Sequence, residues 1–366
     1  GGNNLGISLD ADDRFGSAVS LLDTRLVVGA PGDDGAGNAV ADSGAVYLIT
    51  FTDPALFGAS LAGTIGRGYS GSGDLDLTIL DSADRFGASL SLDGLRLAVG
   101  ATGDDGALGG TASAGAVHLF TFADTAFATP TLARTLGVDY AGANGVPTLD
   151  SGDLFGSAVA LRGETLAVGA PGDRGAGNEQ AGVGAAYLFA VPGASFGGDP
   201  SLTSRIGRGY NGPADINFGP TGVADLFGSA LSLDGGRLVV GAPGDDGPED
   251  RVGNAGSVYF FNTASAVGLP GLGFGDDPGG DVTISASALA AILSGGTGVT
   301  LQANNDITVN AAILVDNPSG DGGNLRLEAG RSIFVNAGIT SDNGRVELFT
   351  NNILFPGAID AFRDPG

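Results

Sequence analysis

The chain has 366 residues, including 68 glycines but no cysteine and no methionine, and its formal net charge is −25. Without cysteine it forms neither a disulfide framework nor a thiolate metal site. Its 41 acidic residues against 16 basic ones argue against nucleic acid as a partner, because a phosphate backbone needs basic groups. No apolar run approaches the roughly 18 residues that a membrane-spanning helix requires. A chain without methionine is expected to be a processed or excerpted piece of a longer protein.

One sequence pattern occurs four times. Each copy has a Phe-Gly pair, followed by an apolar run that ends in Gly-Ala-Pro or, once, in Gly-Ala-Thr. The phenylalanines are 71, 69 and 72 residues apart, at Phe15, Phe86, Phe155 and Phe227. A fixed period of this length predicts an array of similar supersecondary units rather than one irregular globule.

Each copy contains four short segments typical of strands. In the first copy these are residues 15–21, 25–30, 44–48 and 61–69, all bounded by Gly, Asp or Pro. Four short strands in a repeated unit predict the blade of a β-propeller. We expect the Phe to fill the core between neighbouring blades, and the Gly after it to allow close approach of two backbones.

The long period ends near residue 265, where a different pattern begins. Residues 299–303, 325–329 and 346–350 alternate apolar and polar side chains and are separated by Gly, Asn and Asp. Strands that recur every 20 to 26 residues or so suit the coils of a right-handed β-helix. The sequence therefore predicts an all-β chain in three parts: a propeller-like array of four repeats (1–265), a Gly/Pro/Asp linker (266–280) and a β-helix-like segment (281–366).

Two family resemblances rest on these motifs. The Phe-Gly to Gly-Ala-Pro pattern resembles the FG-GAP repeat of integrin α-subunit β-propellers and their bacterial relatives, over roughly residues 1–262. Residues 298–309 carry a motif similar to filamentous-haemagglutinin-type adhesins exported by two-partner secretion, and that resemblance covers roughly residues 280–352. Together they imply an extracellular, surface-associated adhesin or structural protein of a Gram-negative bacterium. Such a protein would associate with itself or with cell-surface or matrix glycans and proteins.

The chain departs from the integrin pattern in two ways. Integrin-type propellers carry an Asp-x-Asp-x-Asp-Gly calcium loop in the first hairpin of a blade, and none of the four hairpins here has it. Those propellers also have seven blades, whereas this chain has four copies of the repeat. The family's metal site is therefore not carried over to these hairpins.

A different acidic loop, directly after Gly-Ala-Pro, is the candidate cation site. Paired carboxylates at a sharp Gly turn suit a hard cation such as calcium, the one cofactor that the sequence indicates. The alternative is a turn in which Asp side chains bond their own backbone. In the third copy Arg174 replaces the second acid, which weakens the metal hypothesis there. The candidate ligands are Asp33, Asp34, Asp104, Asp105, Asp173, Asp245 and Asp246.

Three other polar features have simpler interpretations. An acid precedes each Phe-Gly, and we expect it to cap the strand entry rather than to join a cation cluster; these acids are Asp13, Asp84, Asp153 and Asp225. The only histidine, His118, takes a position that holds Tyr in the other three copies, which predicts a packing role rather than catalysis. Residues 66–69 and 207–210 both read Gly-Arg-Gly-Tyr, and we expect them to pack Tyr between repeats and to turn Arg toward an acid.

The repeat itself favours a non-catalytic function. The acids recur equally in every copy, whereas an active site usually breaks a repeat. Together with the two family resemblances, this predicts a secreted adhesin, or an extracellular structural component that assembles with itself into a filament or matrix. The alternative is a calcium-dependent carbohydrate-binding module or a polysaccharide-degrading enzyme built on a propeller, since paired carboxylates also serve glycoside hydrolysis.

Overall fold

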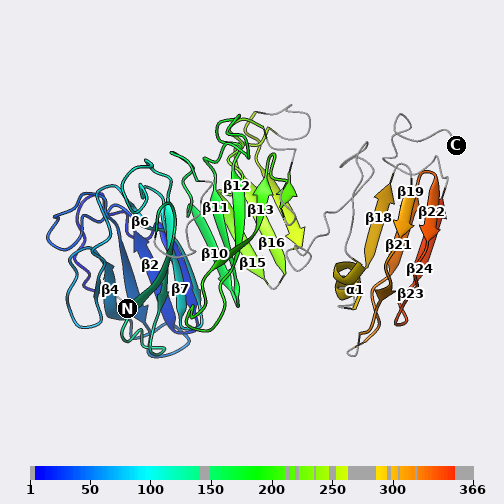
Figure 1. Ribbon diagram of the computed structural model, residues 1–366. Coiled ribbons are helices and arrows are strands. Elements are labelled where there is room, and N and C mark those ends of the chain that lie inside the picture. The colour runs from blue at the N-terminus through cyan, green and yellow to red at the C-terminus, as the bar shows by residue number, and fades with distance from the viewer. Residues whose placement is uncertain are drawn as a thin grey trace. The chain divides into compact units, whose positions relative to one another are not determined.

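The chain folds into two compact units, Gly1–Phe261 and Asn262–Gly366, a division close to the predicted end of the repeats at residue 265. The structure is a computed structural model, shown in Figure 1. It describes residues 5–140, 149–211, 215–218, 222–234, 236–246, 253–262, 286–294, 298–303, 306–317 and 320–350. The predicted linker, 266–280, lies outside the described residues.

Each of the four repeats forms one sheet of mainly antiparallel strands, and the sheets follow one another through the first unit (Figure 1). The first blade contains β1 (Ala18–Leu22), β2 (Arg25–Ala30), β3 (Ala45–Thr50), β4 (Ser60–Gly66) and the short β5 (Leu75–Asp76). The second contains β6 (Phe86–Asp93), β7 (Arg96–Ala101), β8 (Ala116–Thr121) and β9 (Thr131–Leu136). The third contains β10 (Ala158–Arg162), β11 (Thr165–Ala170), β12 (Ala185–Ala190), β13 (Ser201–Gly207) and β14 (Ile216–Asn217). The described part of the fourth contains β15 (Ala230–Asp234), β16 (Arg237–Ala242) and β17 (Ser257–Asn262).

Local sequence explains the strand order within a blade. The first two strands are joined by a two-residue turn; in the second blade Asp93 pairs with Arg96 across Gly94. The backbone of Gly94 has φ +61°, a conformation that favours glycine and matches the twist of a hairpin. In the second blade the apolar second and third strands, β7 and β8, are buried on both faces, as expected for the central strands of a blade.

The Phe-Gly motif joins one blade to the next. Phe86, Phe155 and Phe227 are fully buried, and each forms a backbone bridge with a glycine of the preceding blade. The predicted role of these phenylalanines is confirmed. The predicted close approach is also confirmed: a Cβ atom on Gly29 would lie only 2.0 Å from the carbonyl oxygen of Gly87 in the next blade.

The described residues of the second unit form small parallel sheets and one helix. The predicted repeat segments are parallel neighbours in register, in the order β18 (Val299–Ala303), β21 (Leu325–Ala329) and β24 (Val346–Thr350). The other pairs are β19 (Asp306–Val309) with β22 (Ser332–Val335), and β20 (Ile313–Leu314) with β23 (Ile339–Thr340). These small sheets do not establish the predicted β-helix.

Helix α1 (Ala286–Ser294) was not expected: its nine residues form no long helical period and have no acidic residue in the first turn and no basic residue in the last. Its Ala and Leu content favours a helix. Leu289 and Leu293 pack into the core of the second unit, so tertiary contacts stabilise what the short sequence alone does not. No helix among the described residues is long and apolar enough to cross a membrane.

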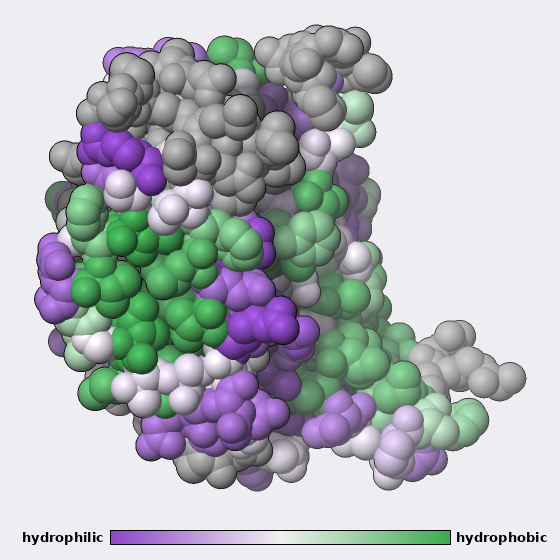
Figure 2. All heavy atoms as spheres, turned by 90° about the vertical axis from the view of Figure 1, so that its right-hand side faces the viewer, coloured by the Kyte–Doolittle hydropathy of each residue, from purple (hydrophilic) through white to green (hydrophobic). Residues whose placement is uncertain are grey.

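The second unit also leaves large apolar side chains exposed, among them Leu314, Phe334 and Leu348. Figure 2 shows hydrophobic residues gathered in a continuous area with hydrophilic residues at its border, on the side of the molecule that it displays. Uncovered apolar area of this kind is common at interaction surfaces.

Candidate functional site

The candidate site is the acidic loop after the second strand of each blade. Its first acid is buried in all four copies, at Asp33, Asp104, Asp173 and Asp245. In each case a tight turn places it, because its N–H bonds the carbonyl of the alanine in Gly-Ala-Pro or Gly-Ala-Thr, three residues earlier. The repeated sequence therefore carries a carboxylate into the interior at the same point of every blade.

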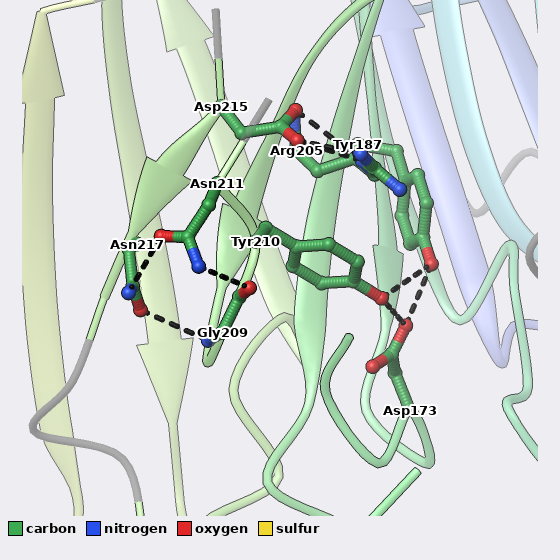
Figure 3. A network of polar contacts seen from close by, with 8 residues as sticks. All are labelled: Asp173, Tyr187, Arg205, Gly209, Tyr210, Asn211, Asp215 and Asn217. Carbon is green, nitrogen blue, oxygen red and sulfur yellow. Dashed lines mark hydrogen bonds and ion pairs between the residues drawn. The ribbon is translucent and has the colours of Figure 1, made fainter. Parts of the chain in front are cut away.

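In the third blade this carboxylate is held by two tyrosines (Figure 3). The Asp173 Oδ2 atom accepts hydrogen bonds from the hydroxyls of Tyr187, at 2.6 Å, and Tyr210, at 2.8 Å. The Oδ1 atom accepts the N–H of Gly175 at 2.7 Å. Burial, together with the charge of Asp173, raises the pKa of the Tyr187 hydroxyl well above its usual value, so the hydroxyl stays protonated and donates.

The first blade repeats this arrangement. Asp33 accepts hydrogen bonds from Tyr47 at 2.7 Å, from Tyr69 at 2.9 Å and from the N–H of Gly35 at 2.8 Å. In the fourth blade the Asp245 carboxylate accepts from Ser257 and Tyr259. A buried carboxylate with its oxygens bonded in this way is stable only as part of its blade.

The tyrosines of the Gly-Arg-Gly-Tyr segments have a contact that the sequence did not predict. Tyr69 and Tyr210 bond the acidic loop of their own blade, and Tyr210 also belongs to the core cluster that joins the second and third repeats. Arg67 donates to the backbone carbonyls of Thr78 and Leu80 and does not face an acid. The sequence showed that this segment is repeated within the chain, but not which groups its side chains contact.

In the three loops that have a second acid, this acid closes a larger turn. Asp34 accepts the N–H of Asp42 at 2.7 Å, and Asp105 accepts the N–H of Ser113 at 2.6 Å. Asp246 accepts the N–H of Asn254 in the same way, eight residues further along the chain. These bonds match the alternative that the sequence left open, in which Asp side chains bond their own backbone.

The calcium hypothesis has little support in this geometry. Among the described residues, no three or more His, Cys, Asp or Glu side chains converge in a way that could hold a metal ion. The carboxylates of the loops already accept hydrogen bonds from tyrosine hydroxyls and backbone N–H groups. In this arrangement the residues do not fit a calcium site, and calcium at the loops stays a prediction.

The acids before Phe-Gly cap the chain where it enters the blade, as predicted. Asp153 Oδ2 accepts the N–H of Asp150 at 2.7 Å, and Asp84 accepts that of Asp81 at the same distance. Both side chains are buried. Burial raises the pKa of Asp84 and of Asp153 to about 7, and the Oδ1 atom of Asp153 has no hydrogen-bond partner.

His118 is a core residue, as its tyrosine position predicted. The ring is fully buried and packs edge-on against Phe86 at 5.5 Å between centroids. Its Nδ1 atom lies 3.0 Å from Thr135 Oγ1, whereas its Nε2 atom lies 3.9 Å from Asp104 and has no hydrogen-bond partner. Burial lowers the pKa of His118 to about 3, so the imidazole is neutral. A neutral, enclosed ring suits packing and not proton transfer with solvent.

A second set of polar residues, which sequence reasoning missed, connects successive blades. Arg25 donates to the turn carbonyl of Gly94 in the next blade at 2.6 Å. The hydroxyl of Ser20 accepts the N–H of Leu92 at 3.0 Å. Arg96 and Ser91 make the equivalent bonds from the second blade to Gly163 and Leu161 of the third. The available signal was the Arg that begins the second strand in three of the four copies.

Comparison with known proteins supports the repeat assignment. Four segments match the FG-GAP repeat: residues 9–49, 80–120, 149–189 and 221–261. The chain thus contains four FG-GAP repeats, which form four blades in a β-propeller arrangement. None of these segments reaches residues 280–352, so the resemblance to filamentous-haemagglutinin-type adhesins stays a prediction.

Other comparisons add little. No curated protein matches the chain. Among solved structures, the crystal structure of the computationally designed Ika4 protein is similar with a TM-score of 0.31 and 14% identity. That similarity covers 70% of this chain and 99% of the designed one, and its TM-score is too low to support a conclusion about this chain.

Proposed function

We propose that this chain is a non-catalytic, secreted bacterial surface protein, either an adhesin or a self-assembling structural component. We further infer that its second unit is a short right-handed β-helix of the filamentous-haemagglutinin type, exported by two-partner secretion. The parallel register of β18, β21 and β24 supports that architecture.

One observation carries the proposal. The acids that are the best candidates for chemistry are used to hold their own blades together, in the same way from blade to blade. His118, which stands where the other three copies have Tyr, is enclosed and neutral. A repeated array that uses its polar groups internally acts through its surfaces, as other repeat proteins do.

The charge supports an exterior location. A net charge of −25 with 36 Asp and 5 Glu keeps a Gly-rich β protein dispersed, and it repels other acidic surfaces unless salt or a specific contact overcomes the repulsion. Binding to a cell surface would therefore depend on particular patches, such as exposed apolar faces or exposed arginines.

The test combines imaging with binding. The purified chain is imaged by negative-stain electron microscopy, and a fluorescent form is applied to bacterial and host cells and to a glycan array, with and without calcium. Assemblies of regular shape, or selective surface binding, support the proposal. Monomeric particles that bind neither themselves nor any surface contradict it.

The same material separates the alternative functions. Selective glycan binding that requires calcium would indicate the carbohydrate-binding module. Polysaccharide turnover that is abolished by Asp173→Asn but unaffected by Asp33→Asn would indicate an enzyme, because the two residues have equivalent contacts in different blades. Equal effects of the two variants would indicate stability and not catalysis.

A further inference from the structure

The first blade exposes a face that the other blades bury. Val19 on β1 is 64% exposed and Leu21 is also exposed. Their equivalents on β6, Leu90 and Leu92, are buried in one core cluster with Val46 of the preceding blade. The face of β1 is therefore built like an interior surface, and no preceding blade in this chain covers it.

The fourth blade exposes the opposite face. Phe260 on β17 is 79% exposed, and Val258 is exposed as well. The equivalent residues on β8, Val117 and Leu119, are fully buried in one cluster with Phe155 of the following blade. The two open ends of the array are thus the two halves of a joint that the chain itself makes between consecutive blades.

A glycine at the open end also indicates a contact with another blade. In the first three blades a glycine of the second strand meets the next blade so closely that a Cβ would lie about 2 Å from a carbonyl oxygen; these are Gly29, Gly100 and Gly169. The equivalent Gly241 has no such neighbour: a Cβ there would first meet Ala230 of its own blade, at 3.3 Å. Its φ lies outside the left-handed region, so its backbone does not require glycine. Close approach of another blade would require it.

The polar residues of the joint are also present at the open end. Arg237 is equivalent to Arg25 and Arg96, which donate to a turn carbonyl of the next blade, but its side chain is 77% exposed. Ser232 is equivalent to Ser20 and Ser91, whose hydroxyls accept an N–H from the next blade. The third blade, which is covered within the chain, has Thr165 and Ala160 at these positions. The uncovered blade therefore retains joint residues that a covered blade lacks.

The first blade offers the matching partners. Asp23 occupies the turn position of Gly94 and Gly163 and has the same left-handed backbone, with φ +53°. Its carbonyl is equivalent to those that accept from Arg25 and Arg96. Gly16, equivalent to Gly87, has open space around the position of a Cβ. An acidic Asp23 opposite an exposed Arg237 adds charge complementarity.

We propose that the β15–β17 face of one copy docks onto the β1 face of a second copy, so that the blade series continues from chain to chain. The inference rests on the self-assembling form of the proposed function and names its partner and its surface. Such a contact is heterologous, because two different patches meet; it forms a ring if the rotation closes and a filament if it does not.

Mixing two single-face variants tests the proposal in the full chain. Val19→Asp damages one face and Phe260→Asp the other, and Leu108→Asp is the control, because Leu108 is exposed but lies on neither face. In sedimentation velocity at up to about 0.1 mM protein, we expect the wild type and the control to associate. Each face variant alone is expected to bind itself at least about tenfold more weakly, which corresponds to about 1.4 kcal/mol.

The mixture gives the decisive result. Each variant retains the face that the other lacks, so an equimolar mixture is expected to form dimers and nothing larger. If Phe260→Asp alone still dimerises as the wild type does, two β1 faces pair with each other and the proposal is wrong. A wild type that stays monomeric at the highest concentration overturns it as well.

Disulfide trapping separates docking from closure of a single chain. The chain has no cysteine, so Asp23→Cys combined with Arg237→Cys introduces the only two thiols. Oxidation is expected to give a ladder of linked copies on a denaturing gel. A bond within one copy would overturn the proposal, because the fourth blade would then cover the first blade of its own chain.

The two proposals can fail separately. If monomeric Val19→Asp still binds cell surfaces, the adhesive function stands without docking as its basis. If the wild type docks as described but forms no extended assembly and binds no surface, the docking stands and the proposed function fails.

Discussion

At the scale of single residues, the buried acids are the most consequential feature. Transferring a carboxylate out of water costs far more than one hydrogen bond returns, so it is stable only when several donors surround it. Asp173 has two tyrosine hydroxyls and a backbone N–H as donors. The acid, the loop and the two strands that carry the tyrosines are therefore interdependent.

Removing one hydroxyl should measurably weaken the fold. Tyr187→Phe deletes the 2.6 Å hydrogen bond to Asp173 and leaves Tyr210 as the remaining hydroxyl donor. A hydrogen bond to a charged group is worth about 1.5–3 kcal/mol, and we expect that loss in the free energy of unfolding, measured by urea denaturation. A double-mutant cycle with Asp173→Asn provides the control. A coupling energy near zero would show that the two groups do not stabilise each other.

At His118, a substitution can add the hydroxyl that Tyr187→Phe removes. In the first blade Tyr47 faces Thr64 across the strands and bonds Asp33; in the second, His118 faces Thr135 and leaves Nε2 without a partner. His118→Tyr should place a hydroxyl on Asp104 and raise the free energy of unfolding by about 1 kcal/mol.

The comparison with Tyr47→Phe identifies the cause. Tyr47→Phe removes the same hydroxyl from the first blade and should be destabilising. If His118→Tyr lowers the free energy of unfolding instead, the second blade lacks the space that the first and third blades provide.

The raised pKa of Asp153 gives a pH dependence with a definite sign. Because burial raises its pKa in the folded chain to about 7, the folded state holds a proton between roughly pH 4 and 7 that the unfolded state releases. The contribution of protonated Asp153 to the free energy of unfolding is fully present below pH 4 and is lost as the pH rises through 7. The free energy of unfolding of the wild type should therefore fall relative to Asp153→Asn over this range, by at most about 4 kcal/mol.

Chemical denaturation of both proteins at pH 4, 6 and 8 measures this difference. Asp199→Asn is a suitable control, because Asp199 is exposed. If the free energy of unfolding of the wild type and of Asp153→Asn depends on pH in the same way, the carboxylate is stabilised as an anion, for instance by a bound cation.

At the scale of elements, the glycines at the contacts between neighbouring blades determine how closely the sheets pack. A Cβ on Gly100 would lie 2.0 Å from the carbonyl oxygen of Gly156, and backbone cannot yield as a side chain does. Gly100→Ala should therefore destabilise the chain by about 1–3 kcal/mol or more, as overpacked cores do. Gly241→Ala is the matched control and should change the stability by less than about 0.5 kcal/mol. Thermal unfolding measures both, and equal effects would mean that the spacing between blades adjusts freely.

The sequence predicted the elements well wherever equivalent positions of several repeats can be compared. Phe86 and its equivalents identified the core between blades, and Tyr at three positions identified the environment of His118. Helix α1 has no second copy for comparison, and its nine residues depend on Leu289 and Leu293 reaching a core that no local pattern reveals.

The partners of polar side chains were harder to predict, for a physical reason. A carboxylate in a turn can accept from its own backbone or bind a cation with the same sequence, and the choice depends on which groups the fold brings near. Asp33 meets Tyr69 from 36 residues away, and Arg25 meets Gly94 from 69 residues away. Such contacts arise from the stacking of strands and blades, which spacing along the chain does not specify.

At the scale of the whole molecule, two forces oppose each other when copies meet end to end. The open faces bury apolar side chains such as Val19 and Phe260, and that attraction depends little on salt. The net charge of −25 on each copy repels the other copy, and this repulsion is screened within about 10 Å at 0.1 M salt.

Salt should therefore strengthen the association. Between about 0.01 and 0.3 M sodium chloride, we expect the dissociation constant measured by sedimentation velocity to fall by about threefold to tenfold, because screening removes long-range repulsion and leaves the apolar contact. Val19→Asp should stay monomeric throughout, which separates docking from non-specific salting out. The opposite trend, weaker association at higher salt, would mean that exposed ion pairs such as Arg237 with Asp23 dominate the joint. In that case the apolar faces would contribute less than their exposure implies.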